Sequence, residues 1–274
     1  MHTNIDRLRI VEIEKIVEET STVRTFAFRD ETSSKARAGQ FLMVWIPGAE
    51  ELPMSAMIWH EQGYAAVTVR KKGYGSTSLY NKKIGERVGL RGPYGNSFEI
   101  QKNARKVILV GGGTGLVPLL RLAGSLNSAR IDTTLIIGAR THPEVFFEEL
   151  ALKSLSDTTH RVVVTTEDGS YGIRGQTTDA MLNLINTERF DTVYTCGPEG
   201  MMKKVFELAR KKSIPIQASL ERYMKCGIGI CASCCIGDRL VCKDGTIFNG
   251  KDLSSLSEFG HEYRDKSGRR CRYI

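Results

Sequence analysis

The stretch VILVGGGTGL, Val107–Leu116, decides the fold class of this chain. A short, continuously apolar run is followed directly by glycines, and then by the helix-like LVPLLRLAGSL (116–126). Such a run is typical of a strand buried on both faces of a parallel sheet. The glycines allow close approach of a pyrophosphate, and a helix N-terminus favours negative charge. The stretch predicts a nucleotide-binding βα turn, although it lacks the usual G-x-G-x-x-G and a ligand-free tight turn is the alternative.

Strand-like and helix-like segments alternate after this turn. They are TTLIIGAR (133–140), EVFFEELALKSL (144–155), RVVVTT (161–166), TTDAMLNLIN (177–186), DTVYTC (191–196), GMMKKVFELARKK (200–212) and IPIQASL (214–220). Alternation of this kind is the pattern of a doubly wound α/β domain. We therefore expect about five parallel strands between residues 102 and 221.

The first hundred residues have a different rhythm, with short apolar or alternating runs divided by turn formers such as Pro47-Gly48 and Gly92-Pro93. The runs expected as strands are Arg7–Lys15, Val23–Phe28, Gln40–Ile46, Met54–Ile58, Ala65–Lys71 and Arg87–Leu90. About six strands without a long helix predict a small antiparallel barrel, which we assign to residues 1–101.

Three short groups are candidate ligand contacts. In the barrel, Pro53, Met54 and Ser55 form one group, while Gly75, Ser76 and Thr77 form another. The second group offers small residues, hydroxyls and free backbone N–H groups, which suit a phosphate nest. The third is Cys196, Gly197 and Pro198, which follow a strand at the sheet edge where α/β domains bind ligands. Taken alone, each group is more often a turn or a buried strand end.

Residues 222–274 carry six of the seven cysteines, five of which lie in KCGIGICASCCIGDRLVC, Lys225–Cys242. Cys226, Cys231 and Cys234 give C-x4-C-x2-C, and Cys242 follows. This spacing is typical of a plant-type 2Fe–2S loop, except that the fourth ligand usually lies further away. Four thiolates are needed to hold two irons, so these four are the predicted metal ligands.

Two other interpretations of the cysteines stay open. A zinc site normally has paired short knuckles, and only Cys231 and Cys234 have that spacing. Disulfides or inert thiols are the remaining interpretation, and clustered cysteines favour metal or redox roles in a reducing compartment. Cys235 is left over by the spacing. The last thirteen residues, EYRDKSGRRCRYI (262–274), are polar and are expected to be a loosely held tail.

Composition excludes some classes of function. Hydrophobic residues make up 41% and charged residues 26% of the 274 positions, which is ordinary for a globular protein. No run resembles a signal peptide or a membrane span, so we expect a cytoplasmic protein without a membrane. The net charge of +8 comes from scattered basic residues without a nucleic-acid motif. A solvated surface or an acidic partner subunit is the favoured reading of that charge.

The order of these parts resembles a known family. From about Leu8 to Leu253 the chain is similar to the ferredoxin–NADP reductase superfamily, and within it to the electron-transfer subunits of NAD-linked dihydroorotate dehydrogenases. The matching motifs are LPMSAM (52–57), VTVRKKGYGSTSL (67–79), RGPYGNSF (91–98), VGGGTGLVPL (110–119), TCGPEGMM (195–202), CGIGICASC (226–234) and CKDGTIF (242–248).

The resemblance implies a ferredoxin-reductase-like FAD-binding barrel, an NAD-binding α/β domain and a small C-terminal 2Fe–2S module. By motif, Pro53, Met54 and Ser55 should border the isoalloxazine, and Gly75, Ser76 and Thr77 should face the FAD diphosphate. Carried over in the same way, Gly112, Gly113 and Gly115 should line the nicotinamide-nucleotide cleft, with Cys196, Gly197 and Pro198 beneath the nicotinamide.

The chain departs from the family pattern at two positions. Leu52 stands where the flavin motif commonly has Arg, so a charge contact to FAD is absent or comes from another residue, for which Arg70 is the candidate. Thr246 replaces Pro in the cluster ending, which should change the local turn more than the ligation.

The implied function is electron transfer. The family's catalytic subunit carries FMN and oxidises dihydroorotate, and electrons pass through a 2Fe–2S cluster and FAD to NAD⁺. A heterotetramer of two of each subunit is the implied partner arrangement, and no side chain here is expected to act as a general acid or base. Two alternatives stay open: the flavin and iron–sulfur subunit of a cytoplasmic hydrogenase or sulfite reductase, and a zinc-stabilised binding module without redox activity. NAD rests on the family alone, because Arg140 could reach a 2′-phosphate or face solvent.

Overall fold

In the described part of the first hundred residues, seven strands form an antiparallel sheet, in agreement with the predicted barrel. The computed structural model describes residues 5–155 and 160–273. The strands are β1 (Arg9–Glu12), β2 (Lys15–Thr20), β3 (Val23–Arg29), β4 (Phe41–Trp45), β5 (Glu51–Met57), β6 (Tyr64–Arg70) and β7 (Arg87–Tyr94). Their order is β1-β7-β4-β5-β6-β3-β2, a half-barrel with β1 and β2 at its edges. Two short helices, α1 (Glu31–Ser34) and α2 (Tyr74–Tyr80), accompany the sheet.

The expected strand Arg7–Lys15 is divided into β1 and β2. At Ile13 the chain changes partner: the Ile13 N–H donates to the Glu86 carbonyl at 2.8 Å, whereas the next N–H, of Glu14, donates to Ala27 at 3.0 Å. The Ile13 side chain is fully buried in the barrel core. One apolar run therefore serves two strands, because it crosses from one edge of the sheet to the other.

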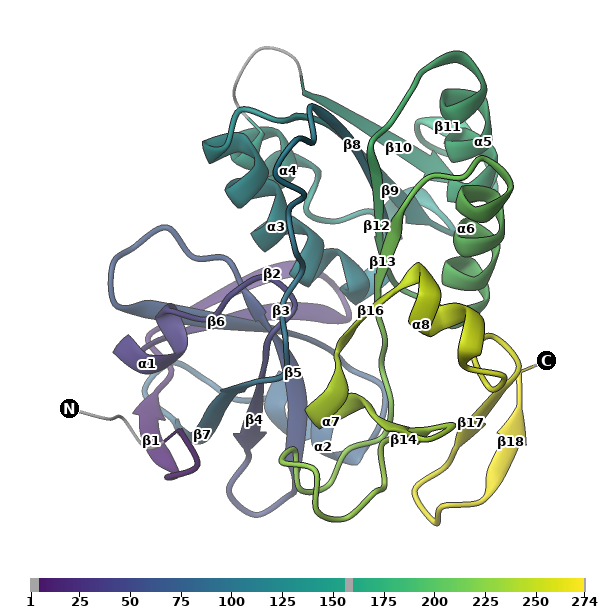
Figure 1. Cartoon of the computed structure of the whole chain (residues 1–274). Coiled ribbons are helices and arrows are strands. Elements are labelled where there is room, and N and C mark those ends of the chain that lie inside the picture. Colours follow the sequence, from purple (N-terminus) through teal and green to yellow (C-terminus); the bar gives the residue numbers. More distant parts are fainter. Residues whose placement is uncertain (1–4, 156–159, 274) are drawn as a thin grey trace.

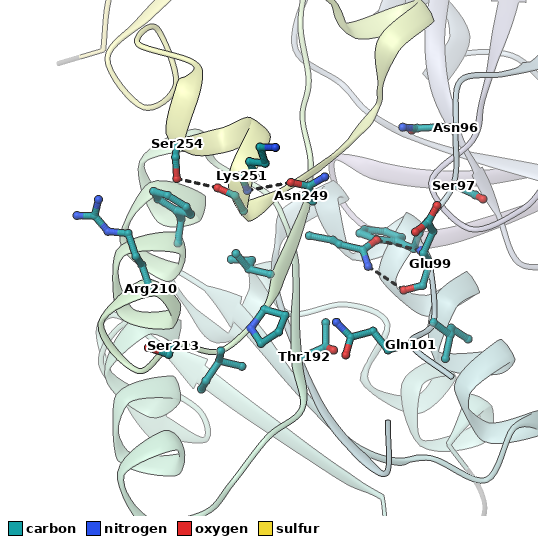
Figure 2. Close-up of a pocket in the computed structure, with 18 of the residues that line it drawn as sticks. Asn96, Ser97, Glu99, Gln101, Thr192, Arg210, Ser213, Asn249, Lys251 and Ser254 are labelled. Atoms are coloured by element: carbon teal, nitrogen blue, oxygen red, sulfur yellow. Dashed lines mark hydrogen bonds between the residues drawn. The ribbon is translucent and has the colours of Figure 1, made fainter. Parts of the chain in front are cut away.

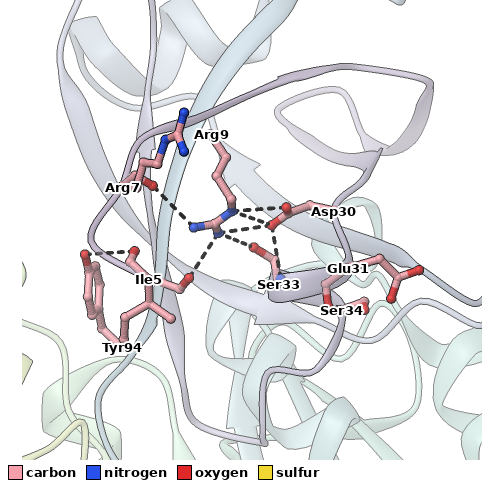
Figure 3. A network of polar contacts seen from close by, with 9 residues as sticks. Ile5, Arg7, Arg9, Asp30, Glu31, Ser33, Ser34 and Tyr94 are labelled. Atoms are coloured by element: carbon pink, nitrogen blue, oxygen red, sulfur yellow. Dashed lines mark hydrogen bonds and ion pairs between the residues drawn. The ribbon is translucent and has the colours of Figure 1, made fainter. Parts of the chain in front are cut away.

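Arg9 holds the β1 edge in place (Figure 3). Its guanidinium donates to both carboxylate oxygens of Asp30, to the Ser33 hydroxyl at 3.2 Å and to the Gly92 carbonyl at 3.0 Å. Asp30 also caps α1 by accepting from the Ser33 N–H. Arg9 thus ties β1, the loop before α1 and β7 together, which compensates for the missing ladder partner on that edge.

A second sheet forms the predicted α/β domain. Its strands are β8 (Lys106–Gly112), β9 (Asp132–Ala139), β10 (Arg161–Thr166), β11 (Ile173–Arg174), β12 (Thr192–Cys196), β13 (Ile216–Ser219) and β16 (Ile247–Asn249). The order β11-β10-β9-β8-β12-β13-β16 is parallel except at β16, which confirms the doubly wound prediction. Short 3-10 turns, η1 (Gly113–Gly115) and η2 (His142–Glu144), follow β8 and β9.

Among the residues that the structure describes, four helices cover the two faces of this sheet. They are α3 (Leu116–Ser128), α4 (Glu148–Ser154), α5 (Thr177–Thr187) and α6 (Glu199–Lys211). Figure 1 shows α3 and α4 on one face, and α5 and α6 on the other. The expected helix 144–155 begins only at Glu148, because Phe146 and Phe147 turn into the core and Phe147 adopts a left-handed backbone conformation (φ 68°).

The C-terminal segment lies beside both larger parts (Figure 1). Its elements are β14 (Cys235–Ile236), β15 (Arg239–Leu240), α7 (Val241–Asp244), β16, α8 (Gly250–Ser255), β17 (Glu262–Arg264) and β18 (Arg270–Arg272). Because β16 pairs with β13, the segment also supplies an edge strand to the α/β sheet. The tail is not loosely held as expected: β17 and β18 form an antiparallel hairpin, and the Tyr273 hydroxyl donates to Glu199 at 2.8 Å.

Candidate functional site

A cleft of about 320 Å³ opens at the carboxyl ends of β8, β9 and β10. The predicted residues Gly112, Gly113 and Pro198 line it, together with Arg70 from the end of β6. The carboxyl edge of a doubly wound sheet is where such domains bind nucleotides. The structure therefore brings residues of three separate motifs together at one opening.

Gly115, Cys196 and Gly197 lie behind this cleft rather than on its lining. A Cβ on Gly115 would approach the Cα of Gly197 and the Cys196 carbonyl to 2.5 Å. A Cβ on Gly197 would lie 3.1 Å from the Gly112 backbone. The missing side chains thus let the turn after β8 and the turn after β12 touch each other, and the glycines shape the cleft by close packing.

Cys196 is almost fully buried at the end of β12, next to Ser219 on β13. Burial raises the pKa of its thiol well above the ordinary value, and the nearby Glu221 carboxylate acts in the same direction. A neutral thiol under the floor of the cleft fits packing better than nucleophilic chemistry.

Glu221 is a candidate that the motifs did not reveal. It follows β13 and keeps part of its surface exposed to solvent. The surrounding protein atoms still remove water from the carboxylate, and this desolvation raises the pKa of Glu221, while the ammonium of Lys72 lowers it. No spacing rule marks a single Glu between a strand and a cysteine loop, so only the fold places it near Cys196.

The three predicted flavin neighbours lie on both faces of β5. Met54 lies opposite Leu42 on β4 and packs against the barrel core, as Leu52 does. Pro53 and Ser55 alternate with them, so their side chains lie on the other face of the strand. Leu52, which replaces the family's Arg, accordingly adds apolar contact to the core.

The edge of β5 offers a further binding feature. Among the described residues, β5 pairs with β6 only through Ala56 and Met57, so the edge from Glu51 to Ser55 is open on that side. Open strand edges present backbone N–H and C=O groups that need partners. This edge fits a planar ligand with hydrogen-bonding groups, such as an isoalloxazine ring.

The first turn of α2 binds an anionic group in this structure. The Gly75 N–H donates to the Glu50 carboxylate at 3.0 Å, and the Lys266 ammonium of the C-terminal hairpin lies 3.4 Å from that carboxylate. Ser76 hydrogen-bonds the Gly73 backbone, and no side-chain hydrogen bond of Thr77 is among those described. A carboxylate between an N–H and an ammonium marks a place where a phosphate oxygen would also fit.

Arg70 lines the nucleotide cleft. Its guanidinium lies 3.7 Å from Glu144 in the nucleotide cleft. The Arg70 side chain therefore reaches the cleft, and Lys266 supplies a cation beside the Glu50 carboxylate that Gly75 contacts.

The four predicted cluster cysteines form two pairs. The Cys231 N–H donates to Cys226 Sγ at 3.5 Å, and the Cys242 N–H donates to Cys234 Sγ at 3.4 Å. The Gly229 N–H donates to Cys242 Sγ at 3.2 Å and so links the loop of one pair to the other. Over residues 5–155 and 160–273, no three His, Cys, Asp or Glu side chains converge tightly enough to hold a single metal ion.

The paired thiols influence each other's ionisation. Burial alone would raise the pKa of Cys231, but hydrogen bonds from Ser233 and contact with Cys226 lower it to about 6. Burial, followed by the adjacent Cys234 thiol, raises the pKa of Cys242 to about 12. The two shifts differ in direction because the exposed Cys231 thiol has hydrogen-bond donors around it, whereas Cys242 is buried beside another thiol.

The cysteine loop is seated on the barrel. Arg91 on β7 donates to the Cys226 carbonyl at 3.2 Å while it holds Glu51 of β5 in a bidentate ion pair. A Cβ on Gly227 would meet Met43 at 2.7 Å, so glycine permits this close contact. Because Met43 lies opposite Pro53, the loop and the predicted flavin neighbours Pro53 and Ser55 share one face of the sheet.

Thr246, the second departure from the family pattern, strengthens this seat. Its hydroxyl donates to the Gly39 carbonyl at 2.6 Å, a bond that proline could not make. Asn96 accepts from the Ile247 N–H and donates to its carbonyl, so both segments fix the cluster module to the barrel.

A larger hollow of about 1180 Å³ lies at the opposite edge of the α/β sheet (Figure 2). Its lining includes Asn96, Glu99, Arg210 and Lys251, and none of the predicted site residues. Ligands of doubly wound domains bind at the carboxyl ends of the strands, so the smaller cleft is the stronger candidate despite its size. In the part of the chain that the structure describes, no helix has the length and apolar character needed to cross a bilayer.

Models of known protein families match two parts of the chain. Residues 221–254 match the family model of the iron–sulfur cluster binding domain of dihydroorotate dehydrogenase B, and residues 109–207 match the oxidoreductase NAD-binding domain. The probable dihydroorotate dehydrogenase B (NAD(+)) electron transfer subunit of Methanocaldococcus jannaschii is 40% identical over 266 residues, covering 96% of this chain and 98% of the relative. The chain belongs to this family of electron transfer subunits. It is therefore an oxidoreductase subunit with an iron–sulfur cluster binding domain and an NAD-binding domain.

Other relatives agree with the family. The corresponding Pyrococcus furiosus protein is also 40% identical and covers 96% of this chain and 98% of its own length. Among solved structures, a chain of an NADH-dependent reduced ferredoxin–NADP oxidoreductase has a TM-score of 0.81 at 31% identity, with 92% and 93% of the two chains covered. A ferredoxin reductase of carbazole 1,9a-dioxygenase, with a TM-score of 0.66 at 20% identity and 77% and 68% coverage, shares the fold.

Proposed function

We propose that this chain transfers electrons to NAD⁺ from a catalytic subunit that carries FMN and oxidises dihydroorotate. The observation that carries the proposal is the position of the cysteine loop. It rests on β4 and β7, on the same sheet face as Pro53 and Ser55, while the nucleotide cleft opens beyond β6 at Arg70. Electrons would then enter at the cysteine loop, pass to the flavin at β5 and leave to the nicotinamide in the cleft.

The proposed resident groups are a 2Fe–2S cluster and FAD. Cys226, Cys231, Cys234 and Cys242 would hold the cluster, since two cysteine pairs match two irons with two thiolates each. The open edge of β5 and the turn at Gly75, Ser76 and Thr77 would hold the flavin and its diphosphate. When bound, these groups supply the one-electron and two-electron transfers needed to connect a flavoprotein partner with NAD⁺.

The chain's own residues would bind and orient these groups. Backbone N–H groups of Gly229 and Ile230 donate to cysteine sulfurs and would stabilise their negative charge. Gly112, Gly113 and Pro198 would admit the nicotinamide nucleotide, and buried Cys196 would support its ring from below. None of these roles requires a side chain that exchanges protons.

The proposed partner contacts the exposed part of the cysteine loop. Ile230 is 77% exposed and Ile228 is 38% exposed, although both are apolar and lie between cluster ligands. Apolar side chains held in solvent beside a redox centre fit a subunit interface. We propose two copies of each subunit in the complex.

The test is an anaerobic preparation of the chain alone and with candidate catalytic subunits. Flavin bands, broad iron–sulfur absorption and two irons per chain are expected, together with dihydroorotate-dependent NAD⁺ reduction in the co-expressed complex. A colourless protein with stoichiometric zinc would refute electron transfer. A co-purifying hydrogenase or sirohaem subunit, with no dihydroorotate activity, would refute the proposed partner and leave the redox assignment intact.

A further inference from the structure

A carboxylate lies between two guanidinium groups in the nucleotide cleft. Glu144 accepts two hydrogen bonds from Arg140, at 2.6 Å and 3.2 Å, and lies 3.7 Å from Arg70. The pKa of Glu144 is lowered, chiefly by the hydrogen bond from Arg140, so the carboxylate is ionised at neutral pH. Glu144 therefore neutralises the cation that directly follows β9.

The position of this pair corresponds to the adenosine end of a dinucleotide site. Arg140 follows β9, the strand beside the glycine turn of β8. In doubly wound domains, an acid near the end of this strand accepts from the ribose 2′-hydroxyl of NAD, whereas an available Arg accommodates the 2′-phosphate of NADP. The geometry here holds both an acid and an Arg, but the Arg is already engaged by the acid.

The other charged residues that line the cleft favour the same outcome. Glu167, directly after β10, adds a second carboxylate to the wall that carries Arg140. Lys204 comes from α6 on the other side, and its ammonium donates to Gln176 at 3.1 Å. A 2′-phosphate near Arg140 would thus meet two acids and a guanidinium whose charge and two of whose N–H groups are engaged by Glu144.

We propose that Glu144 makes this cleft select NAD over NADP, by holding Arg140 and by placing negative charge where a 2′-phosphate would lie. The inference rests on the proposed function of the cleft as the nicotinamide-nucleotide site. It predicts that the protein contains a latent 2′-phosphate site, which loss of one carboxylate charge uncovers.

The test compares Glu144→Gln with wild type in the cofactor-loaded full chain. Calorimetric titration with NAD⁺ and NADP⁺ measures affinity, and NADH- or NADPH-dependent ferricyanide reduction measures turnover without any partner subunit. We expect Glu144→Gln to tighten NADP⁺ binding about tenfold, or about 1.4 kcal/mol, while NAD⁺ affinity changes less than about threefold. Retained NAD⁺ binding also shows that the variant is folded.

Two further variants make the test specific. The double variant Glu144→Gln/Arg140→Gln should not show the tighter NADP⁺ binding, because that binding depends on the Arg140 guanidinium that Glu144→Gln sets free. Glu149→Gln is the matched control, since this carboxylate on α4 is 92% exposed and lies outside the cleft lining. Unchanged NADP⁺ affinity in Glu144→Gln, or a gain that survives the loss of Arg140, would overturn the proposal. A wild-type chain that binds neither nucleotide would refute the assignment of the cleft as the nucleotide site. A chain that binds NAD⁺ and shows the expected NADP⁺ gain in Glu144→Gln, but lacks dihydroorotate activity, would refute the proposed partner and still support the role of Glu144.

Discussion

Arg121→Met should loosen the contact between the barrel and the α/β domain. Arg121 lies on α3, but its guanidinium reaches across to the barrel. It donates to the carbonyls of Ala36 at 2.6 Å, Met57 at 2.7 Å and Ala56 at 3.1 Å. One side chain thus satisfies three carbonyls from two barrel segments, and β5 is one of them.

The magnitude follows from these three bonds and one opposing cost. A hydrogen bond to a charged group contributes about 1.5–3 kcal/mol. Burial lowers the pKa of Arg121, so desolvation of the guanidinium offsets part of that gain. Methionine keeps the aliphatic packing of the stem and removes only the donors. We therefore expect a net loss of about 3 kcal/mol in the free energy of unfolding.

Urea unfolding of the loaded chain, followed by circular dichroism and by flavin release, measures the effect. Because β5 carries both the interdomain contact and the proposed flavin edge, FAD should dissociate at lower urea than in wild type. Arg189→Met is the control, since Arg189 is an exposed arginine of the same domain. A loss below about 1 kcal/mol, or one no larger than that of the control, would refute the reasoning.

Two further predictions concern the C-terminal segment. Cys231→Ala should abolish the iron–sulfur absorption but leave FAD bound, whereas Cys235→Ala should retain both; a cluster that survives the first change, or disappears with the second, would contradict the ligand assignment. Glu199→Ala should lower the free energy of unfolding by about 3–5 kcal/mol because it leaves the buried guanidinium of Arg222 unpaired, while Tyr273→Phe should cost only about 1 kcal/mol. Chemical denaturation compares this pair, and equal losses would show that the ion pair is not the dominant contact.

Local sequence patterns predicted those elements whose burial is visible within one short segment of the chain. The run KVILV and the glycines after it form β8 and η1, and they were predictable because a strand buried on both faces has a continuous run of apolar residues. The four cysteines could be singled out in the same way, because they lie within the short segment Cys226–Cys242. The Arg7–Lys15 run failed as a single strand because a change of pairing partner leaves no mark on hydrophobic periodicity.

Contacts between distant segments were beyond any local pattern. Local reasoning named Arg70 as the candidate cation for FAD, but it did not reveal Lys266 of the C-terminal hairpin, which lies beside Glu50 although the two are 216 positions apart in the chain. The tail itself was expected to be loose because it is polar. It is ordered because its polar groups have buried partners in another domain, and composition carries no information about such partners.

Glu199 makes contacts between distant segments that bear on the proposed function. It begins α6 directly after Cys196, Gly197 and Pro198, and it forms a buried ion pair with Arg222 at the start of the cluster segment. The same carboxylate accepts from the Gly260 N–H at 2.8 Å and from Tyr273. The turn beneath the proposed nicotinamide site and the cluster module therefore share one buried anion. Displacing either would leave a charge without its partner, so the two ends of the proposed electron path are held in register by a residue that takes no part in the transfer.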